Sequence, residues 1–176
     1  VASVGGGVDG ARLLRTVLSA AACRGWRGAA FTGPDMPPEE RAALVAAARG
    51  TAMRVSEFEP MFGDVLGRAD VAVTMGGANT VGDILEAGCR SVLVPRTEPR
   101  QEQVVRARIM AERGRATVVL PSDLSVERLI DAVDRTLTLP QPEPLRLEGA
   151  SRAADVLLGA VTGAAPARAA LAEAAM

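Results

Sequence analysis

Two glycine-rich segments carry the residues best suited to binding phosphate. Residues 5–10 (GGGVDG) and 74–80 (TMGGANT) each follow a short apolar run and precede a segment with helical periodicity. Glycine lets backbone amides approach a ligand closely, and a helix N-terminus offers unpaired N–H groups and about half a positive charge. Two such turns on one sheet favour a nucleotide ligand.

Each turn also has a purely architectural interpretation. Gly5, Gly7 and Gly10 fit the dinucleotide spacing GxGxxG, but no acidic residue stands at the end of the next strand-like run. These glycines equally suit a tight turn with close helix–sheet packing. Thr80 and Asp83 have the spacing of a helix capping box, and on spacing alone that interpretation of the second turn is favoured.

A third candidate is the polar segment 95–103 (PRTEPRQEQ), which lies between an apolar run and a helical segment. Arg96 and Arg100 suit phosphate, and the other polar side chains suit sugar hydroxyls. A solvated loop with weak salt bridges explains the same residues. Composition does not decide between the two interpretations.

The alternation of short apolar runs with amphipathic segments predicts the fold. Strand-like runs stand at 1–4, 28–32, 53–58, 69–74, 91–94 and 117–120, and a helical segment follows each of them. We therefore expect an α/β, Rossmann-like parallel sheet of about six strands with helices on both faces. Ligands bind such sheets at the carboxyl ends of the strands, where the strand order reverses.

Composition excludes several classes of function. The net charge is −1 with acids and bases interspersed, which gives no case for a nucleic-acid or anionic-membrane partner. The absence of His excludes Ser–His and Cys–His catalysis and zinc-type sites, so no metal is expected. No apolar run reaches the roughly 18 residues of a membrane span. We expect a cytoplasmic protein in which Cys23 and Cys89 are small buried thiols.

The extent of the domain follows from the same patterns. A Pro-rich break covers 139–144 and a last helix follows it, so the domain is expected to span residues 1–162. Residues 163–176 are an Ala-rich tail that we expect to fray. Because Val1 opens directly on a strand-like run, we also expect an upstream part that is missing from this chain.

Two segments together resemble the C-terminal domain of glycosyltransferase family 28. Residues 75–83 (MGGANTVGD) and 95–107 (PRTEPRQEQVVRA) are similar, in order and separation, to MGGYNTVxE and PRxxPRxEQxxRA in a branch of predicted glycosyltransferases. The similarity covers about residues 1–137. It implies the C-terminal half of a GT-B fold, in which this domain binds the nucleotide-sugar donor. An N-terminal domain, absent from this chain, would bind the acceptor.

The resemblance also implies a donor site. Its diphosphate would be held by Gly76, Gly77, Asn79 and Thr80, and would face Gly6, Gly7 and Gly10 across the cleft. Arg100 would lie near phosphate, and Gln101 and Glu102 match the polar pair that holds the sugar hydroxyls.

The remaining implied contacts concern the nucleoside. Phe58 would flank the base and the backbone at Glu59 would read its edge, although Phe58 also suits a core position. Asp83 stands where the family has a Glu that binds the ribose hydroxyls, so the ribose is closer or the contact weaker. Ala78 replaces an aromatic residue, which removes local stacking.

The family implies inverting, metal-independent transfer from a UDP- or dTDP-sugar to an unknown acceptor, without a cofactor. The general base is expected in the N-terminal domain, in the same protein or a separate chain. This chain alone should therefore bind the donor without turning it over. Any contact with a membrane would be peripheral, through the missing domain. A partner-dependent nucleotide-sugar-binding subunit and half of a sugar-nucleotide epimerase are the alternatives, and an NAD dehydrogenase is a more distant one.

Overall fold

The computed structural model describes residues 1–162 of the 176-residue chain. Two compact units are present, Val1–Leu145 and a second that begins at Arg146. The predicted extent of the domain, 1–162, stays a prediction. The predicted fraying concerns residues 163–176, which lie outside the described residues.

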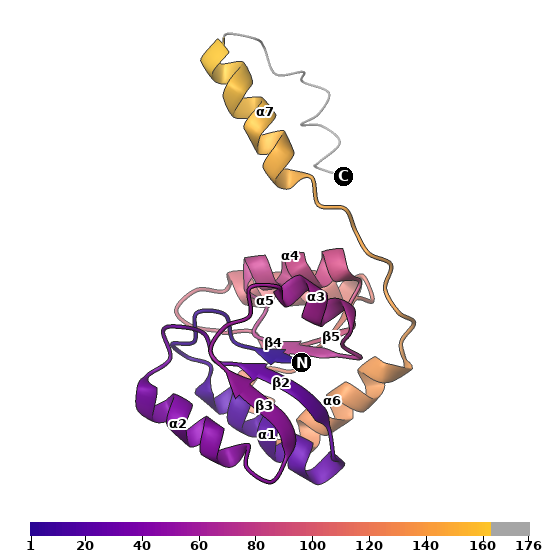
Figure 1. Cartoon of the computed structure of the whole chain (residues 1–176). Coiled ribbons are helices and arrows are strands. Elements are labelled where there is room, and N and C mark those ends of the chain that lie inside the picture. The colour runs from indigo at the N-terminus through magenta and orange to yellow at the C-terminus, as the bar shows by residue number, and fades with distance from the viewer. Residues whose placement is uncertain (163–176) are drawn as a thin grey trace. The chain divides into compact units, whose positions relative to one another are not determined.

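Six parallel strands form one sheet in the order β3-β2-β1-β4-β5-β6 (Figure 1). Ala2 of the central strand β1 lies opposite Ala30 of β2 on one side and Val73 of β4 on the other. The predicted parallel sheet is confirmed, although the run 69–74 is a strand only over its last three residues. The strands are β1 Ala2–Ser3, β2 Arg27–Phe31, β3 Ala52–Ser56, β4 Ala72–Thr74, β5 Ser91–Leu93 and β6 Ala116–Val118.

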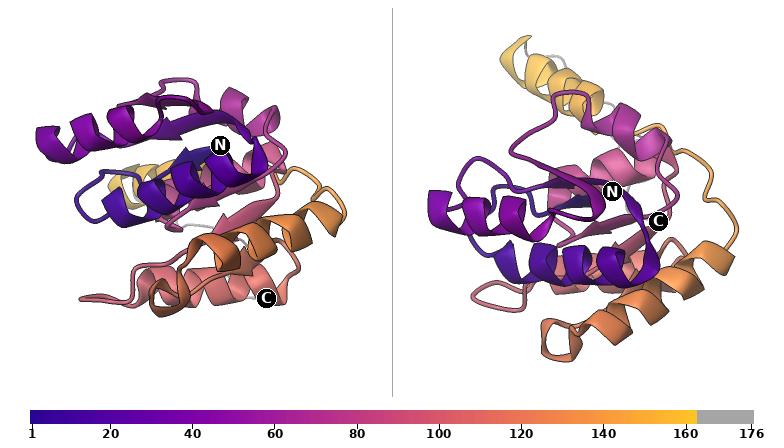
Figure 2. Two further views of the ribbon diagram at one scale, coloured as in Figure 1. Left: turned by 90° about the horizontal axis from the view of Figure 1, so that it is seen from below. Right: turned by 60° about the horizontal axis from the view of Figure 1, so that its bottom comes forward.

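Helices cover both faces of the sheet. Helices α1, α2 and α6 lie on one face, and α3, α4 and α5 lie on the other (Figures 1 and 2). A short 3-10 helix, η1 (Pro121–Asp123), precedes α6 and was not predicted. The helices of this unit are α1 Ala11–Arg24, α2 Pro38–Ala47, α3 Phe62–Gly67, α4 Ala78–Ala87, α5 Glu102–Glu112 and α6 Val126–Thr138.

Each face of the sheet has its own apolar core. On the first face, the side of α1 that carries Leu14, Val17 and Leu18 is buried against the strands, as its periodicity predicts. On the second face, Ile84 of α4 and Met110 of α5 are buried. Burial of these aliphatic side chains contributes about 1.5–3 kcal/mol each.

The prediction for the cysteines is half right. Cys89 is buried in the second core, whereas Cys23 is exposed near the end of α1. The helical period explains the error, because the buried stripe of α1 passes through Ala20 and Ala21 and leaves Cys23 on the solvent side.

The Pro-rich segment after α6 packs on the end of α4. The N–H of Leu145 donates to the carbonyl of Leu85, and the side-chain amide of Gln141 donates to that of Gly88. Gly88 has φ +61°, and a Cβ there would collide with Pro142 and Pro144. The segment therefore fixes the C-terminal end of α4.

The second unit contains α7 (Gly149–Thr162). The predicted last helix is confirmed, and its apolar side chains Val156, Leu157 and Val161 are exposed. Within the described part of the chain, no helix is long and apolar enough to cross a membrane.

We predict that Gly10→Ala destabilises the chain. A Cβ at Gly10 would collide with the side chain of Val4, so overpacking should lower the free energy of unfolding by about 1–3 kcal/mol in urea denaturation. Gly63→Ala is the matched control, because a Cβ there meets nothing within 4 Å and should stabilise α3 by up to about 1 kcal/mol. Equal effects of the two substitutions would contradict the packing role of Gly10.

Candidate functional site

A cavity of about 220 Å³ opens at the carboxyl ends of β1 and β4. The strand order reverses between these two neighbours, because β2 and β3 lie on one side of β1 and β5 and β6 lie beyond β4. Three segments form its walls. They are residues 3–9 at the end of β1 and after it, Met75, Gly77 and Thr80 at the start of α4, and Arg96 and Gln103 between β5 and the first turn of α5. This is the position at which a doubly wound sheet binds its ligands.

In the first glycine turn, some glycines line the cavity and another allows close packing of a helix. Gly5, Gly6 and Gly7 line the cavity, and Gly7 has φ +104° with no room for a Cβ beside the carbonyl of Thr32. Gly10 does not line the cavity and instead lets α1 pack on Val4. The architectural interpretation therefore holds at Gly10, and phosphate binding by Gly5, Gly6 and Gly7 stays a prediction.

Helix α1 begins at Ala11 without a side-chain cap and without an acidic residue in its first turn. The N–H groups of that turn consequently have no anionic neighbour on their own helix. Such an end favours a negatively charged ligand.

The second glycine turn shows the same arrangement. Helix α4 begins at Ala78, its N-cap is Gly77, and neither a side-chain cap nor a first-turn acid is present. Thr80 is thus the third residue of the helix and cannot be its N-cap, so the capping-box interpretation of Thr80 and Asp83 is wrong. Thr80 lines the cavity beside Gly77.

Two side chains hold the peptide groups of Gly76. Its N–H donates to Oγ1 of the fully buried Thr74 at 3.3 Å, and its carbonyl accepts from Nη1 of Arg106 at 2.9 Å. Gly76 has φ +78°, a conformation that favours glycine. The turn before α4 is therefore fixed from both sides while its forward edge faces the cavity.

The loop after β5 supplies the only guanidinium among the residues that line this cavity. Nη1 of Arg96 donates to Oδ2 of Asp9 at 2.9 Å, and its backbone N–H donates to Oε1 of Gln103 at 3.0 Å. The side chains of Arg96 and Asp9 are 34% and 48% exposed. An ion pair this accessible to solvent contributes only about 0.2–1 kcal/mol.

Several predicted residues lie outside the lining of the cavity. Arg100, Gln101 and Glu102 are exposed at or just before the start of α5, and Asn79 is exposed in the first turn of α4. Their contacts with a donor stay predictions. Gln103, which was not predicted, lines the cavity instead; the run of polar residues marked the region but not which side chain turns inward.

The predicted base-binding loop follows β3. Phe58 is 69% exposed, so the alternative of a core position is wrong. Glu59 is partly buried, its Oε1 accepts from the N–H of Met61 at 3.0 Å, and it lines a second cavity of about 640 Å³. The contacts of both residues with a base stay predictions.

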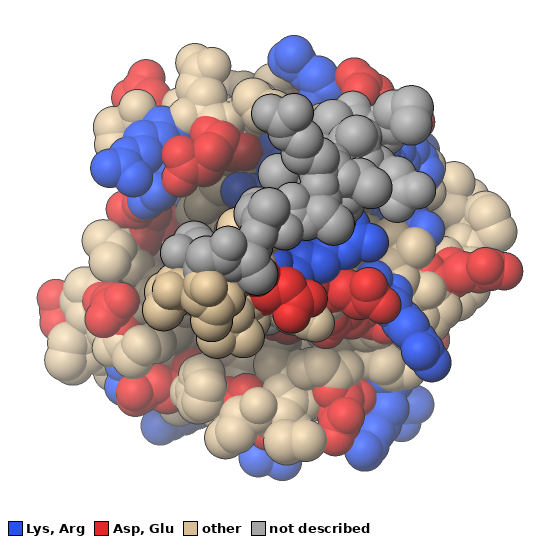
Figure 3. Space-filling view, turned by 90° about the horizontal axis from the view of Figure 1, so that it is seen from above, with Lys and Arg blue, Asp and Glu red and all other residues tan. Residues whose placement is uncertain are grey.

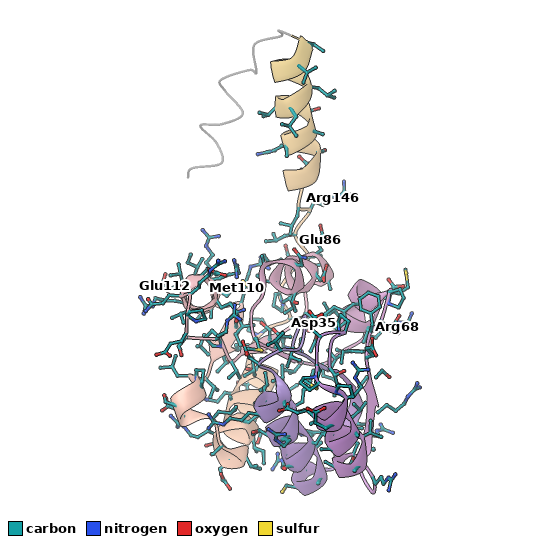
Figure 4. All side chains as sticks on the ribbon, turned by 90° about the vertical axis from the view of Figure 1, so that its left-hand side faces the viewer. Asp35, Arg68, Glu86, Met110, Glu112 and Arg146 are labelled. Atoms are coloured by element: carbon teal, nitrogen blue, oxygen red, sulfur yellow. The ribbon has the colours of Figure 1, made fainter. Side chains whose placement is uncertain are left out.

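Asp83 lies one helical turn after Thr80 on α4 and is partly buried. Desolvation raises the pKa of its carboxyl group, and the charge of Glu86, labelled on α4 in Figure 4, raises it further. A carboxylate kept in surroundings that disfavour its charge is a candidate functional group.

Where side chains are coloured in Figure 3, basic and acidic side chains are intermixed. Among residues 1–162, no group of three or more His, Cys, Asp or Glu side chains could hold a metal ion. Metal independence itself stays a prediction.

Residues 1–157 match the sequence profile of the family described as the glycosyltransferase family 28 C-terminal domain. One similar protein is the UDP-N-acetylglucosamine–N-acetylmuramyl-(pentapeptide) pyrophosphoryl-undecaprenol N-acetylglucosamine transferase of Agrobacterium fabrum, 26% identical over 93% of this chain. The enzyme of the same name from Bacillus licheniformis is 36% identical over 48% of it. The chain spans 46% and 24% of these two relatives, respectively.

Solved structures share the fold. The calicheamicin glycosyltransferase CalG4 matches 99% of this chain and 42% of its own, with a TM-score of 0.63 and 23% identity. MurG of Acinetobacter baumannii matches 78% of this chain and 41% of its own, with a TM-score of 0.61 and 19% identity. Both confirm the predicted fold class.

We predict that Arg106→Ala loosens the turn before α4. The carbonyl of buried Gly76 would lose a charged donor, which should lower the free energy of unfolding by about 1–3 kcal/mol in urea denaturation. Arg106→Lys should restore part of the loss. Arg108→Ala, on the exposed side of the same helix, should change it by less than about 0.5 kcal/mol. A similar loss for Arg108→Ala would contradict the role of the Gly76 contact.

We predict that Asp83→Asn stabilises the free chain at neutral pH. A carboxyl group whose pKa is raised on folding contributes stability below its unfolded pKa, and that contribution is lost as the pH rises through its folded pKa. The melting temperature should therefore rise at neutral pH, and the gain should shrink as the pH falls toward the ordinary value of 3.8. Asp131→Asn, exposed on α6, is the control. A gain that grows on acidification would refute this account.

Proposed function

Because this chain belongs to the family of glycosyltransferase family 28 C-terminal domains, we propose that it is the donor-binding domain of an inverting, metal-independent glycosyltransferase. Its ligand is a nucleoside-diphosphate sugar, with UDP or dTDP as the nucleotide. The observation that carries the proposal is the cavity at the strand-order reversal, where two uncapped helices begin at glycine turns.

The diphosphate occupies this cavity. Backbone N–H groups of the glycine turn before α1 and of the first turn of α4 donate to its oxygens, the hydroxyl of Thr80 adds a donor, and Arg96 supplies a positive charge. The leaving nucleoside diphosphate gains negative charge as the bond to the sugar breaks. Fixed donors stabilise that charge without reorganising, which is the role of preorganised groups at a developing anion.

The nucleoside extends from the cavity along α4 toward the loop after β3. Asp83 accepts hydrogen bonds from the ribose hydroxyls, and the exposed ring of Phe58 covers the base. The sugar lies toward the start of α5, where Gln103 joins Gln101 and Glu102 as a candidate partner of its hydroxyls.

The acceptor and the general base belong to an N-terminal domain, in the same protein or in a separate chain. The relatives above are about twice or more as long as the segment they share with this chain, which leaves room for such a domain in them. In this proposal, the two domains together catalyse the transfer without a cofactor. A cytoplasmic location with peripheral membrane contact through the other domain is proposed on the same basis.

We predict that the chain binds UDP or dTDP more tightly than GDP in isothermal titration calorimetry. The glycosyltransferase VinC, whose fold is similar with a TM-score of 0.59 and 24% identity, was crystallised in complex with dTDP. Asp83→Asn should weaken binding by about 1–3 kcal/mol through loss of a charged acceptor, and Asp131→Asn should not. Absence of binding to all three nucleotides would refute the proposal.

A further inference from the structure

One ion pair bridges the walls of the cavity. Asp9 comes from the glycine turn after β1 and Arg96 from the loop after β5, 87 residues apart in the chain, and Nη1 and Oδ2 are 2.9 Å apart. Of the four ion pairs in the described part of the chain, this is the one whose two members both line the cavity. It joins the loops that follow β1 and β5, two strands that are separated by β4 in the sheet.

Arg96 is only partly engaged by this contact. Its backbone is fixed by Gln103, but its guanidinium uses Nη1 alone on Asp9, and its Nε is buried without a partner among the described residues. A guanidinium presents five donors in a planar fork that matches two oxygens of a phosphate. The pair with Asp9 therefore leaves most of that capacity unused.

A cavity that only binds phosphate has no need of a carboxylate such as that of Asp9. Asp9 lines the same cavity as the uncapped start of α4, and it stands two residues before Ala11, where the uncapped helix α1 begins. Both helix starts favour an anion. A diphosphate there would be repelled by Asp9 and attracted by Arg96. Since the pair is partly exposed and weak, the more highly charged ligand can displace the carboxylate.

We propose that Asp9 and Arg96 form a latch that a diphosphate opens. Without donor, Asp9 holds Arg96 across the cavity. When the nucleoside diphosphate of the proposed function binds, Arg96 exchanges the carboxylate for phosphate oxygens. When the diphosphate product leaves, Asp9 recovers Arg96 and so lowers the affinity for the product. The latch makes Arg96 a residue selective for phosphate charge and Asp9 its internal competitor.

The test is calorimetric titration of the chain with UDP. Asp9→Asn should tighten binding about two- to fivefold, because no contact has to be broken and a repulsive charge is gone. Arg96→Ala should weaken binding about tenfold or more. In the Arg96→Ala background, the gain from Asp9→Asn should fall to less than about twofold, because only the repulsion by the exposed Asp9 charge is then left to remove.

Control experiments distinguish the effect of the latch from a general change in charge near the cavity and from loss of folding. Asp35, labelled in Figure 4, lies beside Gly6 without lining the cavity, so Asp35→Asn removes a nearby negative charge and should leave the affinity unchanged. Uridine, which has no phosphate, should bind all these variants alike in an NMR titration. Melting temperatures establish that each variant is folded.

The outcomes are distinguishable. If UDP binds the unmodified chain and Asp9→Asn binds it no more tightly, or Asp35→Asn tightens it equally, the latch is refuted and the proposed function stands. If UDP, dTDP and GDP all fail to bind the unmodified chain, the proposed function itself fails. A gain for Asp9→Asn of the same size with and without Arg96 would show simple repulsion and would also overturn the latch.

Discussion

Between β1 and β4 the chain changes the direction in which it adds strands, so the connections that leave these two neighbours pass to opposite faces of the sheet. Helices α1 and α4 therefore diverge from adjacent strand ends. Their first turns cannot cover each other, and a gap remains between them. Because neither first turn has a side-chain cap, the backbone donors that face the gap have no anionic partner on their own helix.

Some groups around this gap hold the backbone in place, and others line the cavity. Thr74 and Arg106 bind the peptide groups of Gly76, and the missing Cβ of Gly10 lets α1 approach β1. None of these three groups lines the cavity. Thr80, Arg96 and Gln103 do, as do Ser3 and Asp9, and these are the polar side chains that a ligand could reach. A substitution in the first set should act mainly through the shape of the backbone, and one in the second set through direct interactions.

Much of the fold follows from patterns that are local in the chain. The periodicity of α1 and Ser125, whose Oγ accepts from the N–H of Arg128 to cap α6, can be recognised from neighbouring residues alone. The sheet can be predicted from local patterns too, because each buried strand is a short apolar run. The functional site is predicted less well from such patterns. Thr80 fits the N-cap of a capping box by spacing, but the N-cap of α4 is Gly77, three residues earlier, and the helix begins at Ala78. Spacing does not specify φ and ψ, and here the extended backbone of Gly77 (φ −58°, ψ 152°) immediately precedes the helix.

The contacts across the cavity lie beyond sequence reasoning for a different reason. Asp9 and Arg96 are 87 residues apart, and only the packing of β1 beside β4, with β5 next to it, brings their loops together. Likewise, Gln101, Glu102 and Gln103 are chemically similar neighbours, and the rotation of α5 about its axis selects the third of them. Local composition contains no information about that rotation.

The Pro-rich segment after α6 has a thermodynamic consequence for the opposite end of α4. Gln141 and Leu145 satisfy carbonyls at the C-terminal end of this helix, and Arg106 holds the turn at its start. A ligand at the first turn thus meets a backbone whose conformational entropy has already been lost during folding. Little ordering is left for binding to accomplish, so the affinity at this end of α4 is governed by desolvation of the donors and of the ligand.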